Sequence, residues 1–207
     1  MFDFAQKACQ PKDYPTISET DDRGREPRAV VWQMRVEQAM FGAGCFWSVE
    51  EAFRQVEGVV NVAVGYSGGK VANPSYRMVC SDRTGHAEVV HVQYDAERVS
   101  YDDLLSVFWE IHDPTTLNRQ GVDIGSQYRS AIFFYSDDQR ARAEVSKREL
   151  QHSGRFGRPI VTEISPASAF YRAEEYHQRY LEKAGLSEGC SVNGCGGKTL
   201  RKVLRHG

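Results

Sequence analysis

The sequence lacks a long apolar run and an excess of charge of either sign. Its 26 Lys and Arg residues nearly balance 28 Asp and Glu residues, which leaves a formal net charge of -2 over 207 residues. This balance favours neither nucleic acid nor an anionic membrane as a partner. A membrane-spanning helix needs about 20 consecutive apolar residues, and no segment approaches that length. We therefore expect a protein that binds neither nucleic acid nor membrane.

Export signals are missing from the first residues as well. Residues 1–28 have no apolar core of a secretory signal peptide, and they carry too many acidic side chains for a mitochondrial presequence. We therefore expect a cytoplasmic protein, in a compartment that keeps thiols reduced. Cysteine is scarce, with five residues: Cys9, Cys45, Cys80, Cys190 and Cys195. They are not expected to form a permanent disulfide framework.

Proline and glycine divide the chain into three segments. Residues 1–34 are polar and interrupted by proline, which predicts an N-terminal extension without regular structure. Residues 35–184 carry strand and helix patterns and are expected to form one domain. Residues 185–207 begin with a glycine-rich, weakly apolar stretch, which predicts a mobile tail that carries Cys190 and Cys195.

Two periodicities alternate within residues 35–184. Alternating runs and runs of β-branched and aromatic residues predict strands at residues 36–41, 59–66, 86–95, 128–135 and 160–164. Helical spacing and capping residues predict helices that start beside Cys45, Ser100 and Ser136, and one over residues 170–183. Because hairpin-like strands and helix-separated strands are mixed, we expect an α+β sandwich and not a regular βαβ series.

One cysteine lies where a strand pattern ends and a helical pattern begins. Small residues precede Cys45 in the segment GAGCFWSV, residues 42–49. At a helix N-terminus, unpaired amides and the macrodipole stabilise an anion, so a thiol there would have a lowered pKa and a larger thiolate fraction. Free cysteine is also a common core residue. The pattern alone leaves Cys45 open between a nucleophile and a packing residue.

A carboxylate lies on the apolar side of another strand pattern. In residues 86–95, Glu88 shares one face with Val90, Val92 and Tyr94. Loss of hydration there would favour the protonated carboxyl, which can donate a proton at neutral pH. A strand edge, or a register shifted by one residue, would instead leave Glu88 in water, and for an isolated glutamate that explanation is the better one.

The tail supplies two more thiols. Cys190 and Cys195 lie in a glycine-rich segment that can bring a sulfur to another cysteine. A zinc site is the alternative, but only His177 or His206 is left to complete the four ligands that structural zinc prefers. A redox pair fits better. A thiolate, a protonated acid and secondary thiols together predict a reductase that works through a sulfenic acid.

Six segments resemble, in order, the A-type peptide methionine sulfoxide reductases. They are GCFW (44–47), NPSYRMVCS (73–81), TGHAEVV (84–90), FWEIHDPT (108–115), DIGSQYRS (123–130) and EEYHQRYL (174–181). The resemblance implies reduction of methionine S-sulfoxide, free or in proteins, to methionine. It also implies the fold of that family, a two-layer α+β sandwich with a mixed central sheet and a ferredoxin-like core.

The resemblance assigns the reaction to four side chains. Cys45 would be the nucleophile, Glu88 the acid, and Tyr76 and Tyr128 the hydroxyls that hold the sulfoxide oxygen. This oxygen is a poor leaving group, so attack of a thiolate on sulfur is productive only if the oxygen is protonated, which a neutral Glu88 can do. The two phenols would stabilise charge that develops on the same oxygen.

The resemblance assigns four further side chains to the substrate pocket: Phe46, Trp47, Asp123 and His177. The rings of Phe46 and Trp47 would contact the substrate methyl group, Asp123 would orient the substrate, and His177 would support the pocket. Because a sulfoxide sulfur is chiral, separate places for methyl and oxygen select one epimer. Other candidates are expected to be structural residues or bystanders: His86, His112, Cys9 and Cys80.

Regeneration would use the tail. Cys190 would condense with a sulfenic acid on Cys45, Cys195 would then attack Cys190, and a thioredoxin-like dithiol would reduce the enzyme. The sequence departs from the family pattern at Ser48, where glycine is commoner, and in the spacing of the tail cysteines. We expect no bound cofactor or metal, and a monomer that acts on oxidised proteins.

Two rival functions stay open. A cysteine acyl-transferase or hydrolase would require a histidine base beside Cys45 and would leave the tail cysteines without a role. A non-catalytic module would instead dock oxidised or apolar segments on Phe46 and Trp47, with zinc bound in the tail.

Overall fold

The computed structural model describes residues 34–186. Nearly all of the predicted N-terminal extension and of the predicted tail lie outside this range, as do Cys190 and Cys195, so the proposed division of the chain stays a prediction. Among the described residues, no helix has the length and apolar character needed to cross a membrane.

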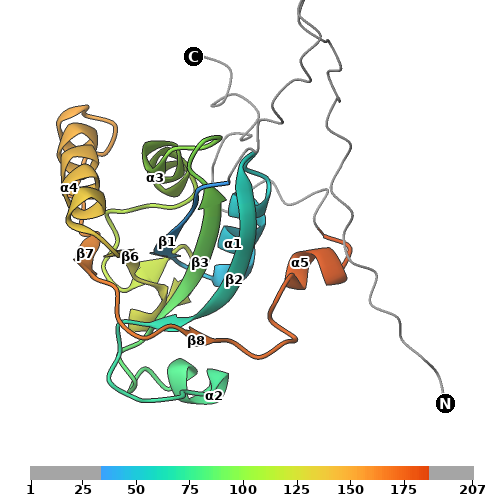
Figure 1. Ribbon diagram of the computed structural model, residues 1–207. Helices are drawn as coiled ribbons and strands as arrows, with labels where there is room; N and C mark the ends of the chain where they lie inside the picture. Colours follow the sequence, from blue (N-terminus) through green and yellow to red (C-terminus); the bar gives the residue numbers. More distant parts are fainter. Residues whose placement is uncertain (1–33, 187–207) are drawn as a thin grey trace, which may run out of the picture. The chain divides into compact units, whose positions relative to one another are not determined.

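A six-stranded sheet forms the centre of the described residues (Figure 1). Its strands are β1 (Val36–Ala43), β2 (Val59–Ser67), β3 (Ala87–Asp95), β6 (Ser130–Phe134), β7 (Glu163–Pro166) and β8 (Tyr171–Arg172). They lie in the order β7-β6-β1-β3-β2-β8, and only β6 and β7 run parallel. The sheet is therefore mixed, as predicted.

The helices and a small hairpin connect these strands. They are α1 (Phe46–Arg54), α2 (Tyr76–Cys80), α3 (Tyr101–Glu110), β4 (Arg119–Gln120), β5 (Asp123–Ile124), the 3-10 helix η1 (Ser126–Tyr128), α4 (Asp137–His152) and α5 (Tyr180–Lys183). In chain order, β1, α1, β2, β3, α3 and β6 form a β-α-β-β-α-β unit, and its four strands are adjacent as β6-β1-β3-β2. This is the ferredoxin-like arrangement. The predicted α+β fold is confirmed.

Alternation along β1 places apolar side chains on both faces of the sheet. Phe41 lies in the core between the sheet and the helices, where its ring centroid is 5.1 Å from that of Phe53 on α1 and 5.3 Å from that of Phe108 on α3. Helices α1 and α3 thus cover one face (Figure 1). Met40 points to the other face, where Phe170 packs against the cluster.

Local sequence signals set the starts of two helices as predicted. The Ser100 side chain accepts a hydrogen bond from the Asp103 N–H, and the Asp103 carboxylate accepts one from the Ser100 N–H, which completes a capping box for α3. Ser136 Oγ accepts a hydrogen bond from Gln139 N at the start of α4.

Two predictions about the last third of the domain were wrong. Residues 170–183 are not one helix: they form β8, a series of turns and only then α5. The Ala173 N–H donates to Val64 O on β2, so this segment first extends the sheet edge. The strand predicted over residues 160–164 also begins later, as β7 at Glu163. Val161 N donates instead to Pro114 O in a distant loop. Tertiary hydrogen bonds overrode the local pattern in both places.

Candidate active site

Cys45 lies between the end of β1 and the first turn of α1, as the sequence predicted. It occupies the N-cap position of α1 and is half-buried. The preceding Gly44 has φ +91°, and a Cβ there would lie 2.7 Å from Cγ of Gln120 on β4. Glycine is required at this position both for its positive φ and for the close approach of the β4–β5 hairpin.

The predicted lowering of the Cys45 pKa was wrong. Burial, and after it the Glu88 carboxylate, raises the pKa of the Cys45 thiol to about 12. The backbone N–H groups of Trp47 and Ser48 at the start of α1 lower this pKa, but by less. Desolvation disfavours the thiolate more than the helix N-terminus stabilises it. The thiol is therefore protonated at neutral pH.

Glu88 is buried, as predicted, with 2% of its surface exposed. It lies on β3 opposite Tyr66 of β2, and its Oε2 accepts a hydrogen bond from the Phe46 backbone N–H at 3.1 Å. Burial raises the pKa of the carboxyl to about 7, and the Asp123 carboxylate acts in the same direction, while the Phe46 N–H lowers it. The carboxyl is therefore a much weaker acid than an exposed glutamate and can exchange its proton near neutral pH.

Two phenols lie near the same carboxyl. Tyr76 is the first residue of α2 and Tyr128 the last of η1. Burial raises the pKa of both, to about 12 for Tyr128, and the charge of Glu88 contributes to each shift. Both hydroxyls are thus protonated donors close to Glu88. Cys80, predicted to be a bystander, also contributes to both shifts and is exposed at the end of α2.

Asp123 completes the polar side of the site. Its carboxylate contributes to the raised pKa values of Cys45, Glu88 and Tyr128, which places it near all three groups. It is paired across the β4–β5 hairpin with Gln120, the residue that packs against Gly44. The hairpin, which the sequence did not predict, therefore brings Asp123 to the site.

The site also has an aromatic wall formed by Phe46, Trp47, His177 and Tyr180. The Trp47 ring stacks on Tyr180 with centroids 3.9 Å apart, and Trp47 Nε1 donates to His177 Nδ1 at 3.1 Å. The Phe46 ring centroid is 5.2 Å from that of His177. Phe46, Trp47 and His177 thus come together as predicted, whereas Tyr180 was missed.

The tautomer of His177 follows from its hydrogen bond. Because Nδ1 accepts from Trp47, the ring proton lies on Nε2. Burial lowers the pKa of His177, so the ring is neutral at pH 7. Nε2 is a buried donor that has no partner within the described residues. Ser48, the departure from the family pattern, donates its hydroxyl to Cys45 O at 3.1 Å and so stays on its own helix.

Sequence reasoning missed three polar side chains around this wall: Glu50 and Gln178, which are buried, and Glu174, which is half-buried. Glu174 accepts from Tyr76 N at 2.9 Å and from the Tyr66 hydroxyl at 3.1 Å. Gln178 bonds to both the N–H and the C=O of Val64. Their partners are backbone groups and a phenol far away in sequence, so no local pattern indicated them.

His86 and His112 are structural residues, as predicted. His86 accepts from Gly69 N at 3.0 Å and binds Val71 O at 2.8 Å, which closes the loop after β2. His112 lies between Phe108 O and Ser130 Oγ, each at 2.7 Å, and burial lowers its pKa to about 4. Within the range that the structure describes, no histidine is hydrogen-bonded to Cys45.

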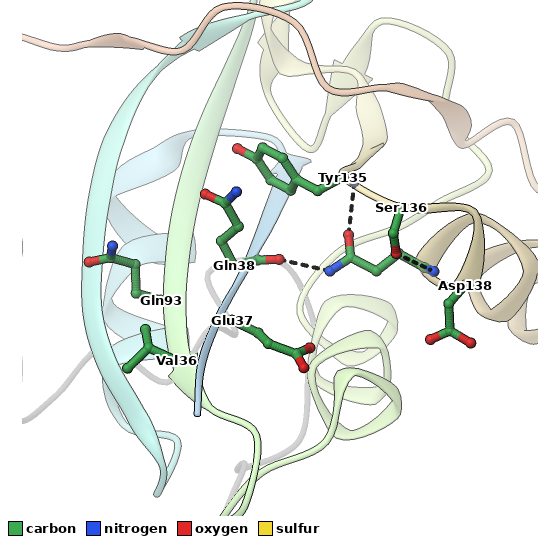
Figure 2. A pocket seen from close by; sticks show the side chains of 8 residues that line it. Val36, Glu37, Gln38, Gln93, Tyr135, Ser136 and Asp138 are labelled. Carbon is green, nitrogen blue, oxygen red and sulfur yellow. Dashed lines mark hydrogen bonds between the residues drawn. The ribbon is translucent and has the colours of Figure 1, made fainter. Parts of the chain in front are cut away.

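A separate pocket of about 530 Å³ lies at the other end of β1 (Figure 2). Gln139 lines this pocket, and its side-chain amide donates to Gln38 O at 2.7 Å and accepts from Tyr135 N at 2.9 Å; Figure 2 labels Gln38 and Tyr135. The pocket is lined by Val36 at the start of β1, whereas Cys45 lies two residues after the end of β1. None of the predicted site residues lines it. Over residues 34–186, no group of three or more His, Cys, Asp or Glu side chains is arranged to hold a metal.

The site combines a thiol at a helix start with a carboxyl whose pKa is near neutrality, and phenols and an aromatic wall lie around them. This combination is typical of a thiol-dependent enzyme. The family model described as "Peptide methionine sulfoxide reductase" matches residues 37–203. The peptide methionine sulfoxide reductase MsrA of Methanothermobacter thermautotrophicus is 64% identical over 149 residues, which is 72% of this chain and 88% of that protein. The chain belongs to the A-type peptide methionine sulfoxide reductase family.

Solved structures show the same fold. Reduced Mxr1 from Saccharomyces cerevisiae is 37% identical, with a TM-score of 0.70, and the match covers 76% of this chain and 90% of that one. Mxr1 in complex with Trx2 is 27% identical, with a TM-score of 0.51, over 74% of this chain and 91% of that one.

Proposed function

We propose that the protein reduces the S-epimer of methionine sulfoxide, free and in peptides, to methionine. The observation that carries this proposal is Glu88: a buried carboxyl with a pKa of about 7, hydrogen-bonded to the residue that follows Cys45. A proton donor of this strength beside a thiol suits a reaction in which oxygen must be protonated as sulfur is attacked. Membership of the family supports the same reaction.

In the chemical step, Cys45 Sγ attacks the sulfoxide sulfur and the oxygen passes to the cysteine. The bond between oxygen and the methionine sulfur breaks, Cys45 becomes a sulfenic acid, and the methionine sulfur is reduced. Glu88 gives its proton to the oxygen, and the proton that leaves the thiol restores it. Below pH 7, both Cys45 and Glu88 carry their protons when the reaction starts, because their pKa values are about 12 and about 7.

Substrate orientation separates the two small groups on the sulfoxide sulfur. Tyr76 and Tyr128 donate hydrogen bonds to the oxygen, and Phe46 and Trp47 receive the methyl group. Asp123 orients the rest of the substrate from the hairpin side, and His177 supports the aromatic wall. Because oxygen and methyl occupy different places, only one epimer presents its sulfur to Cys45.

Regeneration requires thiols beyond the described residues. Cys190 condenses with the sulfenic acid and releases water, and Cys195 then attacks Cys190, which frees Cys45. A thioredoxin dithiol reduces the resulting disulfide and is itself oxidised. The relative Mxr1 in complex with Trx2 supports thioredoxin as the reductant. The enzyme would act in the cytoplasm as a monomer without a bound cofactor, in the repair of oxidised proteins under oxidative stress.

The test is incubation of the protein with each separated methionine sulfoxide epimer and excess dithiothreitol. We expect methionine from the S-epimer alone, and none with Cys45→Ser. Failure to reduce the S-epimer, or undiminished activity in Cys45→Ser, would overturn the proposal.

A further inference from the structure

Glu50 is a buried carboxylate that the proposed reaction does not use. It lies on α1, one turn after Phe46, with 2% of its surface exposed. Both of its oxygens accept a hydrogen bond from the Arg179 backbone N–H, at 3.0 and 2.8 Å. A buried carboxylate is costly unless it is hydrogen-bonded. The contact with Arg179, 129 residues away in sequence, is therefore the feature that explains its position.

The backbone at Arg179 is in an unusual conformation. Its φ of 53° and ψ of 39° lie in the left-handed region, which non-glycine residues adopt at a cost. The turn ends an irregular segment and starts α5 with Tyr180. A hydrogen bond to a carboxylate is about twice as strong as one between neutral groups, so Glu50 is suited to offset this cost.

The peptide that Glu50 holds lies between two residues of the aromatic wall. His177, two residues earlier, accepts the Trp47 indole N–H at 3.1 Å. Tyr180, the next residue, stacks on the Trp47 ring with an interplanar angle of 12°. Helices α1 and α5 are in contact, so the Glu50–Arg179 hydrogen bond connects α1 to the segment that carries His177 and Tyr180.

We propose that Glu50 is a positioning residue for the aromatic wall: through the Arg179 turn it fixes His177 and Tyr180 against Trp47. This inference rests on the proposed function, in which Trp47 receives the methyl group. Glu50 does not touch the substrate and acts through Arg179 alone.

Other contacts would keep the domain folded without Glu50. Gln178 still bonds to Val64 on β2 and to Ala173 O, which attaches the segment to the sheet edge. The Arg54 and Arg179 side chains still pair with Glu182 on α5. Loss of the Glu50 carboxylate therefore removes the restraint on the Arg179 turn but leaves the domain folded.

The test compares Glu50→Ala with Glu51→Ala, its neighbour on the same helix. Within the described residues, the Glu51 carboxylate accepts hydrogen bonds only from Arg54, the last residue of α1, and from Gln55, its C-cap. Glu51→Ala is therefore the matched control. For methionine S-sulfoxide, we expect Glu50→Ala to raise KM by about 10-fold with kcat nearly unchanged, because the wall binds the methyl group in the ground state and in the transition state alike. Glu51→Ala should leave KM unchanged.

A second readout does not depend on activity. The chain has three tryptophans, and the Trp47 indole N–H resonance is assigned by its loss in Trp47→Phe. We expect this resonance to shift in Glu50→Ala and to stay in place in Glu51→Ala. If the wild-type protein does not reduce methionine sulfoxide, the proposed function fails while this resonance still tests the positioning role.

Two outcomes would overturn the inference. An unchanged KM together with an unshifted Trp47 resonance in Glu50→Ala would remove the connection to the wall. A fall in kcat at constant KM would place the effect on the chemical step instead. Should Glu50→Ala fail to fold, Glu50→Gln, which keeps one acceptor oxygen, replaces it, and an intermediate rise in KM is expected.

Discussion

The Phe46 backbone N–H donates a hydrogen bond to Glu88 Oε2 at 3.1 Å, across 42 residues of sequence. This bond joins the first residue of α1 to a carboxyl on β3. That carboxyl is buried and lies near Cys45. The hydrogen bond favours the charged form of Glu88, whereas burial favours the neutral form, and burial is the larger effect. The carboxyl therefore exchanges its proton near neutral pH.

Glu88→Gln should slow the chemical step by about 100-fold or more, because general acid catalysis typically contributes that much. The amide can still accept the Phe46 N–H but cannot release a proton to the sulfoxide. In the wild type, the single-turnover rate should fall as pH rises through about 7, because Glu88 then loses the proton that it donates. The variant should lack this limb. Rapid quench over pH 5.5 to 9 checks both points, and a retained limb would show that another group is the acid.

The Cys45 thiol should react slowly with iodoacetamide at pH 7 in the absence of substrate. Since its pKa is raised to about 12, the rate should rise with pH without a plateau below about pH 10. Glu88→Gln should react faster at pH 8, because the nearby negative charge is gone. The measurement uses a variant whose other four cysteines are serine. A plateau near pH 7 would be inconsistent with the buried, protonated thiol.

Glu88→Gln should also be more stable than the wild type at pH 8 and equally stable at pH 4. The folded-state pKa of Glu88 is raised from 4.5 to about 7, so its favourable contribution is complete below pH 4.5 and is lost as pH rises through 7. A pKa shift of this size corresponds to a loss of at most about 3 kcal/mol in the free energy of unfolding of the wild type above pH 8. Urea unfolding of both proteins at the two pH values measures the difference, and a wild type more stable than the variant at pH 8 would contradict it.

Gly44→Ala should destabilise the protein and reduce activity, whereas Gly154→Ala should only destabilise it slightly. Both glycines have positive φ, but a Cβ at Gly44 meets Gln120 at 2.7 Å and a Cβ at Gly154 meets nothing within 4 Å. The strained φ costs about 1 kcal/mol at either site, and the clash should add about 1–2 kcal/mol at Gly44. Urea unfolding and reductase assays compare the two. Equal effects of both changes would argue against a required contact between Gly44 and the hairpin.

Cys190→Ser should complete one turnover and then stop when thioredoxin is the reductant. The sulfenic acid on Cys45 would still form, but no disulfide relay would carry the oxidation onward. Methionine formed per enzyme, measured without and with thioredoxin, checks this. Normal thioredoxin-driven turnover would point to Cys195 or to direct reduction of Cys45.

Much of the site was predictable because its signals are local. The change from strand to helix pattern placed Cys45 at a helix start, and alternation along β3 put Glu88 on the more apolar face, although only the family resemblance favoured a buried acid there. The capping box at Ser100 and Asp103 was equally local. The helix over residues 170–183 was the largest error, since Tyr180 there stacks on Trp47 and Tyr171 pairs with Tyr66 of β2, so the aromatic spacing does not mark a helix face.

By itself, the sequence determined which side chains can react and that Cys45 lies at a helix start and Glu88 on a strand, because residue type and periodicity are local properties of the chain. Only the tertiary structure decided how those side chains are charged and held. Burial, a sum over distant neighbours, raises the Cys45 pKa against the effect of its own helix. Likewise, the Glu50 carboxylate meets the Arg179 N–H, which is 129 residues further along the chain, only once the chain has folded. Solvation and long-range hydrogen bonds have no signature in a local pattern, which is why they appear only in the folded protein.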